Sequence, residues 1–340
     1  MNSIPSYIKK IQLGTDLQAA EMEDAIGLMM SGAVSQNEMG SLLLALKKKG
    51  EAVSEIVGAA RAMRSKMSSI SSSRSDLVDT CGTGGDGSGT FNVSTAAAIV
   101  AAGAGISIAK HGNRKVSSKT GSADVLTELG VNVSSSKETV ENCLNEVGLC
   151  FCFAPLFHES VKNVGAVRKS LGVPTIFNLL GPLCNPAGAS FQLVGVGNPD
   201  QRQRIAAALQ QLGTTRSVVV HGNDGICEVS NSSTTAVTMV NPNELKSVTW
   251  EPEDFQLKGS TRSAILASDP QQSAGLIQKV LNGENCPARD IVVMNAAAAI
   301  WLVGHEGDNL AVCAKKAIES IDSGAAYRKL TRLAVLSQMN

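Results

Sequence analysis

The stretch Asp79-Thr-Cys-Gly-Thr-Gly-Gly-Asp-Gly-Ser-Gly-Thr-Phe-Asn-Val-Ser-Thr95, followed by Lys110-His-Gly-Asn-Arg114, decides what the fold of this chain is built around. Its closely spaced glycines let the backbone turn tightly, so that amide N–H groups can converge on phosphate oxygens. The apolar pair before them suits a short strand, and the alanine-rich run after them, to Gly105, suits a helix. The N-terminus of that helix adds a partial positive charge. The sequence therefore predicts a strand, a glycine loop and a helix that together bind an anion.

Three interpretations of this glycine loop compete. The string Gly82-Thr-Gly-Gly-Asp-Gly87 matches the G-x-G-x-x-G pattern of dinucleotide-binding folds, which also need an acidic residue after the next strand. The next strand candidate, 106–109, instead leads into Lys110, His111 and Arg114, and these cations favour a polyphosphate. A Walker A loop ends in Gly-Lys-Ser/Thr, which does not follow these glycines. A glycine-rich turn without a ligand is the third interpretation, and the basic cluster counts against it.

Outside the loop, the chain divides into a helical part and a mixed part. Residues 1–72 show helical periodicity, in which Leu17, Met29, Leu42 and Leu43 suit either a core or an interface. A serine-rich stretch, 65–75, marks the boundary. In residues 73–340 strand-like segments alternate with helical ones. The clearest strands are 106–109, 150–153, 192–196 and 217–220, and the clearest helix is 122–129. We therefore predict an α/β fold: a small N-terminal all-helical domain and a larger α/β domain with a mainly parallel central sheet flanked by helices.

Composition narrows the class of protein. A chain of 340 residues has room for two domains and a sizeable core. Its 30 Lys and Arg balance its 30 Asp and Glu, so we expect no nucleic-acid partner and no membrane partner. The N-terminal stretch lacks the pattern of a signal peptide, which predicts a cytoplasmic location. The eight cysteines are scattered, and we expect them to be reduced and mainly buried.

Several long motifs in one order resemble the anthranilate phosphoribosyltransferase family, and the matching segments run from about residue 75 to 330. They are Gly82–Asp86, Asn92–Thr95, Lys110–Arg114, Gly121–Asp124, Ala154-Pro155, His158, Val167-Arg168, Thr175–Pro186, Asp224-Gly225, Glu228 and Asn295–Ala299. The resemblance implies a magnesium-dependent glycosyltransferase of tryptophan biosynthesis. Such an enzyme moves the phosphoribosyl group of phosphoribosyl pyrophosphate to the amine of anthranilate, which gives N-(5-phosphoribosyl)anthranilate and pyrophosphate. It also implies that part of 164–180 packs on the helical domain, and that two chains pair there as a homodimer.

The resemblance further assigns roles to individual residues. Lys110 and Arg168 are the expected catalytic residues, and the planar fork of Arg168 suits the carboxylate of anthranilate. Contacts with phosphoribosyl pyrophosphate are implied for Gly82, Gly85, Asp86, Thr90, Asn92, Val93, Ser94, Thr95, Lys110, His111, Gly112, Asn113, Arg114, Lys115, Val116, Ser117, Ser118 and Ser122. Contacts with anthranilate are implied for Gly82, His111, Asn113, His158 and Arg168. Ser94 and Glu228 are the implied magnesium ligands, since magnesium prefers hydroxyl and carboxylate oxygens.

Two positions depart from the family pattern. Where the family has an Asp-Glu pair, this chain has Cys227-Glu228, so one hard magnesium ligand is missing. We expect one magnesium to bind more weakly, with Asp224 or water as the candidate replacement at the position of Cys227. Glu159 stands where the family usually has a proline. Because Lys110–Arg114 and Arg168 match the family, a transferase with altered metal dependence is favoured over a related phosphoribosyltransferase with another acceptor.

Two further alternatives come from other functional classes. A pyrimidine nucleoside phosphorylase shares the helical-plus-α/β layout, but those enzymes carry a Lys-His-Ser-Thr-Gly-Gly type motif where this chain has Lys110-His-Gly-Asn-Arg114. A non-catalytic relative that binds nucleic acid should be noticeably cationic. The net charge of zero and the shortness of the longest basic run, Lys47–Lys49, count against that alternative.

Overall fold

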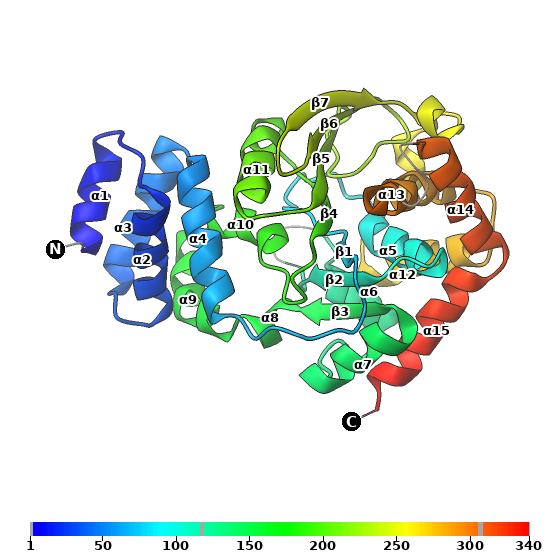
Figure 1. The fold of residues 1–340 in the computed structure, drawn as a ribbon, viewed down its shortest axis with the longest axis horizontal. Coiled ribbons are helices and arrows are strands. Elements are labelled where there is room, and N and C mark those ends of the chain that lie inside the picture. The colour runs from blue at the N-terminus through cyan, green and yellow to red at the C-terminus, as the bar shows by residue number, and fades with distance from the viewer. Residues whose placement is uncertain (1–2, 116–118, 305–308, 340) are drawn as a thin grey trace.

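The computed structural model describes residues 3–115, 119–304 and 309–339. Four helices form one end of the molecule (Figure 1): α1 (Ile4–Gln12), α2 (Ala19–Met30), α3 (Gln36–Lys49) and α4 (Val53–Lys66). Leu17, Met29, Leu42 and Leu43 are fully buried between them, so these residues form a core. The large apolar side chains that this bundle exposes are instead Leu13 and Leu44.

One seven-stranded sheet dominates the rest of the described chain, in the order β3-β2-β1-β4-β5-β6-β7. Its strands are β1 (Val78–Asp79), β2 (Ile108–Gly112), β3 (Leu149–Phe153), β4 (Phe191–Gly195), β5 (Arg216–Gly222), β6 (Thr235–Val240) and β7 (Leu245–Trp250). The first five strands are parallel, and β6 and β7 add an antiparallel edge. The predicted fold class is confirmed. The β6–β7 hairpin went unpredicted, although its strands carry the β-branched residues typical of strands.

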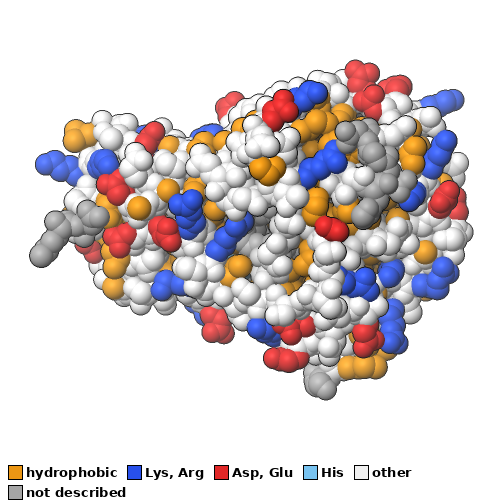
Figure 2. Space-filling model, viewed as in Figure 1, with side chains coloured by type: hydrophobic (Ala, Val, Ile, Leu, Met, Phe, Trp, Pro, Cys, Tyr) orange, Lys and Arg blue, Asp and Glu red, His pale blue; other side chains and the backbone are white. Residues whose placement is uncertain are grey.

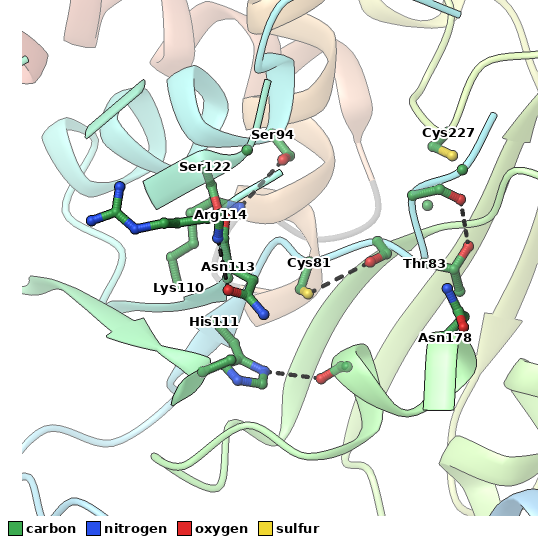
Figure 3. A pocket seen from close by; sticks show the side chains of 18 of the residues that line it. Cys81, Thr83, Ser94, Lys110, His111, Asn113, Arg114, Ser122, Asn178 and Cys227 are labelled. Atoms are coloured by element: carbon green, nitrogen blue, oxygen red, sulfur yellow. Dashed lines mark hydrogen bonds between the residues drawn. The ribbon is translucent and has the colours of Figure 1, made fainter. Parts of the chain in front are cut away.

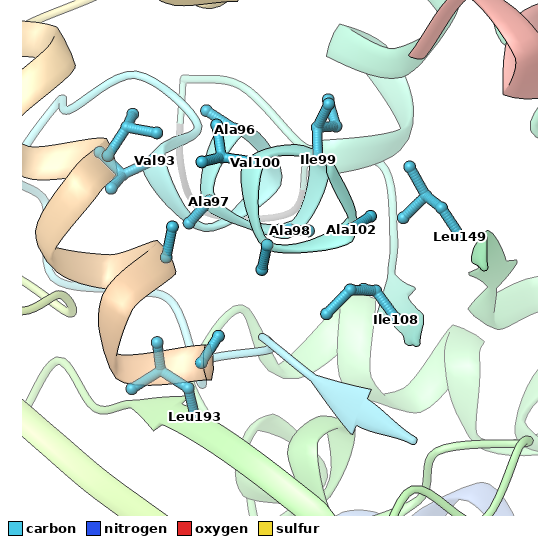
Figure 4. Packing of buried hydrophobic residues seen from close by; sticks show 14 of the residues in the cluster. Val93, Ala96, Ala97, Ala98, Ile99, Val100, Ala102, Ile108, Leu149 and Leu193 are labelled. Atoms are coloured by element: carbon cyan, nitrogen blue, oxygen red, sulfur yellow. The ribbon is translucent and has the colours of Figure 1, made fainter. Parts of the chain in front are cut away.

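Helices cover both faces of the sheet. Neighbouring residues of a strand point to opposite faces, so two adjacent residues of β4 pack against different helices. Leu193 of β4 packs in the cluster of α5 (Val93–Gly103) and α13 (Pro287–Val303), as Figure 4 shows for α5. Val194 packs instead with α11 (Pro199–Gln211) and the helical bundle. The remaining helices of the α/β part are α6 (Ser122–Glu128), α7 (Lys137–Val147), α12 (Pro270–Leu281), α14 (Leu310–Asp322) and α15 (Ala325–Ser337).

After β3 the chain crosses to the helical bundle and returns before β4 (Figure 1). The crossing contains the helices α8 (Ala154–Phe157), α9 (Lys162–Leu171) and α10 (Phe177–Leu180), with short 3₁₀ turns at Glu159–Val161 and Gly181–Leu183. Val164 and Val167 of α9 are buried in the same apolar cluster as the bundle. The same cluster continues onto β4 and β5, so the apolar packing does not divide the chain at residue 72. The predicted domain boundary at that residue stays a prediction.

Two local differences from the sequence prediction affect the site. β2 begins at Ile108, two residues later than expected, because Gly105 has a φ of 96° and Ile106 N still donates to Ala101 O at the end of α5. Lys110 and His111 therefore lie inside the strand instead of after it. The serine-rich stretch is also bonded to α7: Ser71 N donates to Glu141 Oε1 at 2.8 Å.

The surface carries charges of both signs. Figure 2 shows acidic and basic side chains interspersed on one face of the molecule. Among the described residues, no helix is both long and apolar enough to cross a membrane.

Candidate active site

The glycine loop after β1 is held by backbone packing against two other loops. A Cβ on Gly82 would lie 2.8 Å from Gly195 O, and a Cβ on Gly195 would lie 1.7 Å from Cys227 O. Thr83 N donates to Gly195 O at 2.9 Å. Gly84 and Gly85 have positive φ values of 63° and 78°, which favour glycine. The sequence thus places glycine where three loops meet backbone to backbone.

Strand β2 contributes side chains to two sides of the site, because successive side chains of a strand point to opposite faces. Figure 3 shows Lys110 directed toward Ser94 at the start of α5, and His111 directed to the opposite side. Lys110 Nζ donates to Thr80 O at 2.6 Å and to Ser94 Oγ at 3.2 Å. The lysine is 3% exposed, so its charge lies at the bottom of the site.

The buried carboxyl group of Asp79 lies close enough to Lys110 to interact with its charge. Asp79 ends β1 and is fully buried; its Oδ1 accepts from His111 N at 3.1 Å and its Oδ2 accepts from Asn185 Nδ2 at 2.8 Å. Burial raises the pKa of Asp79 to about 6, although Lys110 and these hydrogen bonds act in the opposite direction. Asp79 therefore connects β1, β2 and the loop that carries Asn185.

Two neutral imidazoles face each other in the cavity. His111 Nδ1 lies 2.9 Å from Gly181 O, and since a carbonyl oxygen only accepts, this nitrogen carries the proton. His111 Nε2 therefore presents a lone pair, and it is buried without a hydrogen bond among the described residues. The ring of His158 lies 5.1 Å from that of His111. Burial lowers the pKa of each histidine to about 4, so both are neutral near pH 7.

Arg168 enters the cavity from the crossing segment. Its guanidinium lies 5.2 Å from the centre of the Phe177 ring, in cation–π geometry. Burial lowers the pKa of Arg168, yet an arginine stays charged in proteins. Because α9 packs on the helical bundle, this cation is positioned by the opposite part of the molecule from Lys110.

An acidic corner lies at the other end of the cavity. Asp86 Oδ2 accepts from Cys227 N at 2.9 Å, and Asp86 Oδ1 accepts from Ser88 N at 2.9 Å. Burial alone would raise the pKa of Asp86, but these hydrogen bonds lower it. Burial raises the pKa of Glu228 to about 8; Lys110 opposes the shift and Asp86 adds to it. Burial and the two carboxylates raise the pKa of the Cys227 thiol well above its ordinary value, so position 227 carries no negative charge.

Asp224 lies apart from this corner. Its Oδ2 accepts from Ser230 Oγ at 3.0 Å and from Ser232 Oγ at 2.5 Å, and it does not line the cavity. Its role as a replacement ligand stays a prediction, and these bonds to serines count against it.

A single cavity of about 510 Å³ brings most of the predicted residues together. Those that line it are Gly82, Gly85, Asn92, Ser94, Lys110, His111, Gly112, Asn113, Arg114, Ser122, His158, Arg168, Cys227 and Glu228. Asp86, Thr90, Val93, Thr95, Lys115 and Asp224 do not line it. Val93 and Thr95 are buried in the first turn of α5, and Lys115 N donates to Asp124 Oδ2. Val116, Ser117 and Ser118 lie outside the described residues.

Sequence reasoning assigned no role to several residues that line the cavity. Thr80, Cys81 and Thr83 stand beside Gly82 in the quoted stretch, so their position gave a signal. Asn178 lies within the Thr175–Pro186 motif. Met63, from α4 of the helical bundle, gave no signal, because only the tertiary packing brings it to the cavity.

Comparison with known families fits this architecture. Residues 74–327 match a family model described as "Glycosyl transferase family, a/b domain". Residues 5–67 match one described as "Glycosyl transferase family, helical bundle domain". The fold and the site therefore define a glycosyl transferase with a helical bundle and an α/β domain.

Relatives identify the particular family. Anthranilate phosphoribosyltransferase of Rhodopirellula baltica is 50% identical over 321 residues, 94% of this chain and 94% of that protein. The crystal structure of anthranilate phosphoribosyltransferase from Thermus thermophilus has a TM-score of 0.91 and 38% identity, and all of both chains is covered. The Saccharomyces cerevisiae enzyme in complex with PRPP and Mg has a TM-score of 0.89 and 30% identity, with 98% of this chain and 97% of that chain covered. The same yeast enzyme in complex with 4-fluoroanthranilate has a TM-score of 0.87 at the same identity and coverage. The chain belongs to the anthranilate phosphoribosyltransferase family.

Proposed function

We infer that this chain transfers the phosphoribosyl group of phosphoribosyl pyrophosphate to the amine of anthranilate, which gives N-(5-phosphoribosyl)anthranilate and pyrophosphate in tryptophan biosynthesis. It is a glycosyltransferase that uses Mg²⁺. One observation carries the inference beyond family membership: a single cavity joins the glycine loop and Lys110 to Arg168 and His158. A site for a phosphorylated donor and a site for a carboxylate-bearing acceptor thus share one space.

The donor half stabilises a leaving group that gains negative charge. When pyrophosphate departs, charge grows on its oxygens, and fixed donors near those oxygens lower the barrier. The hydrogen bond from Thr83 N to Gly195 O fixes the glycine loop, and the buried charge of Lys110 is held by Thr80 O and Ser94 Oγ before substrate binds. This half needs no rearrangement to supply positive potential.

The acidic corner fits magnesium. Glu228 supplies a carboxylate and Ser94 supplies a hydroxyl at the cavity wall, and these are hard oxygen ligands of the kind that magnesium prefers. Burial raises the pKa of Glu228 to about 8, and Asp86 adds to the shift while Lys110 opposes it, so a bound cation would stabilise the charged carboxylate. We propose Ser94 and Glu228 as the ligands, with the neutral thiol of Cys227 contributing little. When bound there, magnesium supplies positive charge beside the pyrophosphate oxygens.

The acceptor half recognises a carboxylate beside an aromatic amine. Arg168 suits the carboxylate, because its planar fork can donate two parallel hydrogen bonds. His111 Nε2 has a free lone pair that can accept from the amine. An aniline nitrogen is neutral at pH 7, so this half orients the nucleophile and does not have to deprotonate it before attack.

Location and assembly are also part of the proposal. We propose that the enzyme works in the cytoplasm, where a reducing environment suits eight cysteines that form no disulfide bond with one another. We propose that it forms a homodimer through the helical bundle, which exposes Leu13 and Leu44. Its partners are the two substrates, with no nucleic acid and no membrane.

The test is a progress curve of anthranilate fluorescence with both substrates and a magnesium titration. Loss of the signal should need both substrates and magnesium. Arg168→Ala should lower kcat/KM for anthranilate by roughly 30- to 700-fold, since removing one partner of a buried charge pair costs about 2–4 kcal/mol. Lys169→Ala is the matched control, because this neighbouring cation is exposed and should change little. A signal that stays constant at every magnesium concentration, with the donor still binding by calorimetry, would show that the acceptor is a different molecule.

A further inference from the structure

Two loops form the acidic corner of the cavity, and one arginine outside the cavity binds both of them. Arg262 begins the 3₁₀ turn Arg262–Ile265 and does not line the cavity. Its Nη1 donates to Asp224 O at 2.8 Å, on the loop after β5. Its Nη2 donates to Ser88 O at 3.2 Å, on the glycine loop. One guanidinium therefore connects the two chain segments whose side chains meet at this corner.

The same two loops also meet directly, closer to the cavity. Asp86 Oδ2 accepts from Cys227 N at 2.9 Å, and Asp86 Oδ1 accepts from Ser88 N at 2.9 Å. Glu228, which we propose as a magnesium ligand, directly follows Cys227. The contact between Asp86 and Cys227 and the two bonds of Arg262 thus hold the loops together at two points.

The backbone around Arg262 is itself attached to the glycine loop. The segment that follows the arginine pairs with the end of that loop as an isolated antiparallel bridge. Phe91 N donates to Ile265 O at 2.9 Å. Ala267 N donates to Gly89 O at 2.9 Å. The guanidinium therefore extends from a fixed backbone, and its planar fork can donate to two carbonyl oxygens at once.

The two loops carry charges of the same sign. Asp86 lies on one loop and Glu228 on the other, and like charges in a partly buried corner repel each other. We propose that Arg262 is a positioning residue, which binds one carbonyl of each loop and so keeps Glu228 and the glycine loop in the geometry that binds the donor with magnesium. The identity of that donor rests on the proposed function. Arg262 itself touches no reacting atom, so its effect is transmitted through the two loops.

Hydrogen exchange of the purified chain, measured by NMR without substrates, tests the contact. In Arg262→Ala the N–H of Cys227 should exchange about fivefold faster or more, because the two loops separate more easily. Arg204→Ala is the matched control. Arg204 is also partly buried and donates to two backbone carbonyls away from the cavity, Asp200 O at 3.3 Å and Glu51 O at 3.1 Å. In this control the exchange at Cys227 should be unchanged.

Calorimetric titration with phosphoribosyl pyrophosphate at several magnesium concentrations tests the consequence for the site. Arg262→Ala should weaken donor binding about five- to tenfold at low magnesium, on the order of the loss of one hydrogen bond to a charged group. Saturating magnesium should restore most of the affinity. Loss of the cation alone would instead tighten magnesium binding, so the direction of the change separates positioning from simple repulsion.

The acceptor half provides a further readout, which a general loss of stability would also change. Arg168 is carried by α9, which packs on the helical bundle and not on the acidic corner. KM for anthranilate in Arg262→Ala should therefore equal that of the natural chain, while KM for phosphoribosyl pyrophosphate rises. An equal rise in both KM values would show that Arg262 acts only on overall stability.

An unchanged exchange rate at Cys227, or an unchanged donor affinity, in Arg262→Ala would overturn the proposal. If that variant does not fold, Arg262→Gln decides by the same two measurements, because its shorter, neutral amide cannot bridge both carbonyls. A natural chain that binds no phosphoribosyl pyrophosphate would contradict the proposed function. The exchange rates would then still decide whether Arg262 holds the two loops together.

Discussion

At the scale of single residues, position 227 controls how strongly the acidic corner binds magnesium. Cys227→Asp places a third carboxylate beside Asp86 and Glu228. Burial already raises the pKa of Glu228 to about 8, and the charge of Asp86 adds to that shift. We expect the half-saturating magnesium concentration to fall by about tenfold, since a charge-assisted contact contributes roughly 1.5–3 kcal/mol and part of that offsets repulsion. Cys227→Ser, which adds no charge, should leave it near that of the natural chain. A magnesium titration that is the same for all three proteins would contradict this account.

His158 sets a pH dependence of stability. Its pKa falls from 6.5 in the unfolded chain to about 4 in the folded protein because of burial, with the neighbouring His111 adding to the effect. At pH values between these two, His158 binds a proton in the unfolded chain but not in the folded protein. The free energy of unfolding therefore falls as the pH falls from about 6.5 to 4. His158→Gln should remove about 3 kcal/mol of that loss, by the conversion of 1.36 kcal/mol per pKa unit. Urea unfolding from pH 7 to pH 4 measures the difference, and an unchanged slope in the variant would exclude His158 as its source.

At the scale of elements, the contact of α2 with α4 depends on a glycine. A Cβ on Gly58 of α4 would lie 2.2 Å from Ala19 O and 2.8 Å from Met22 Cβ, so the two helices would have to separate. Gly58→Ala should destabilise the protein by about 1–3 kcal/mol, the usual cost of overpacking. The same substitution at Gly27 of α2 meets nothing within 4 Å and should stabilise by up to about 1 kcal/mol through helix propensity. Thermal unfolding of both variants checks the pair, and shifts in the same direction would show that the contact is not tight.

This helix contact also affects the site, because α4 carries Met63 to the cavity wall and α9 carries Arg168. Both helices are held by the bundle. A change in the bundle should therefore alter the acceptor half before the donor half, which is built on the sheet. In Gly58→Ala, KM for anthranilate should rise more than KM for phosphoribosyl pyrophosphate.

At the scale of the whole molecule, the proposed homodimer depends on the exposed apolar residues of the bundle. Leu44 on α3 is 45% exposed, and a glutamate there would place a charge in an apolar interface. Sedimentation of the natural chain should give twice its mass of 35.3 kDa, and Leu44→Glu should shift the equilibrium to the monomer. Leu266→Glu is the control, since Leu266 is 47% exposed on the α/β part. A natural chain that sediments as a monomer would exclude the dimer at that concentration.

The sequence by itself determined the class of fold, the anion-binding loop and the basic cluster. These features are local: glycines with positive φ, the strand before them and the helix after them are encoded within about 30 residues. Only the tertiary structure decided which side chains meet. The register of β2 sends Lys110 to one face and His111 to the other, and the crossing segment brings Arg168 and Asn178 to the same cavity as Met63. Such meetings follow from sheet order and long-range packing, which local periodicity does not encode.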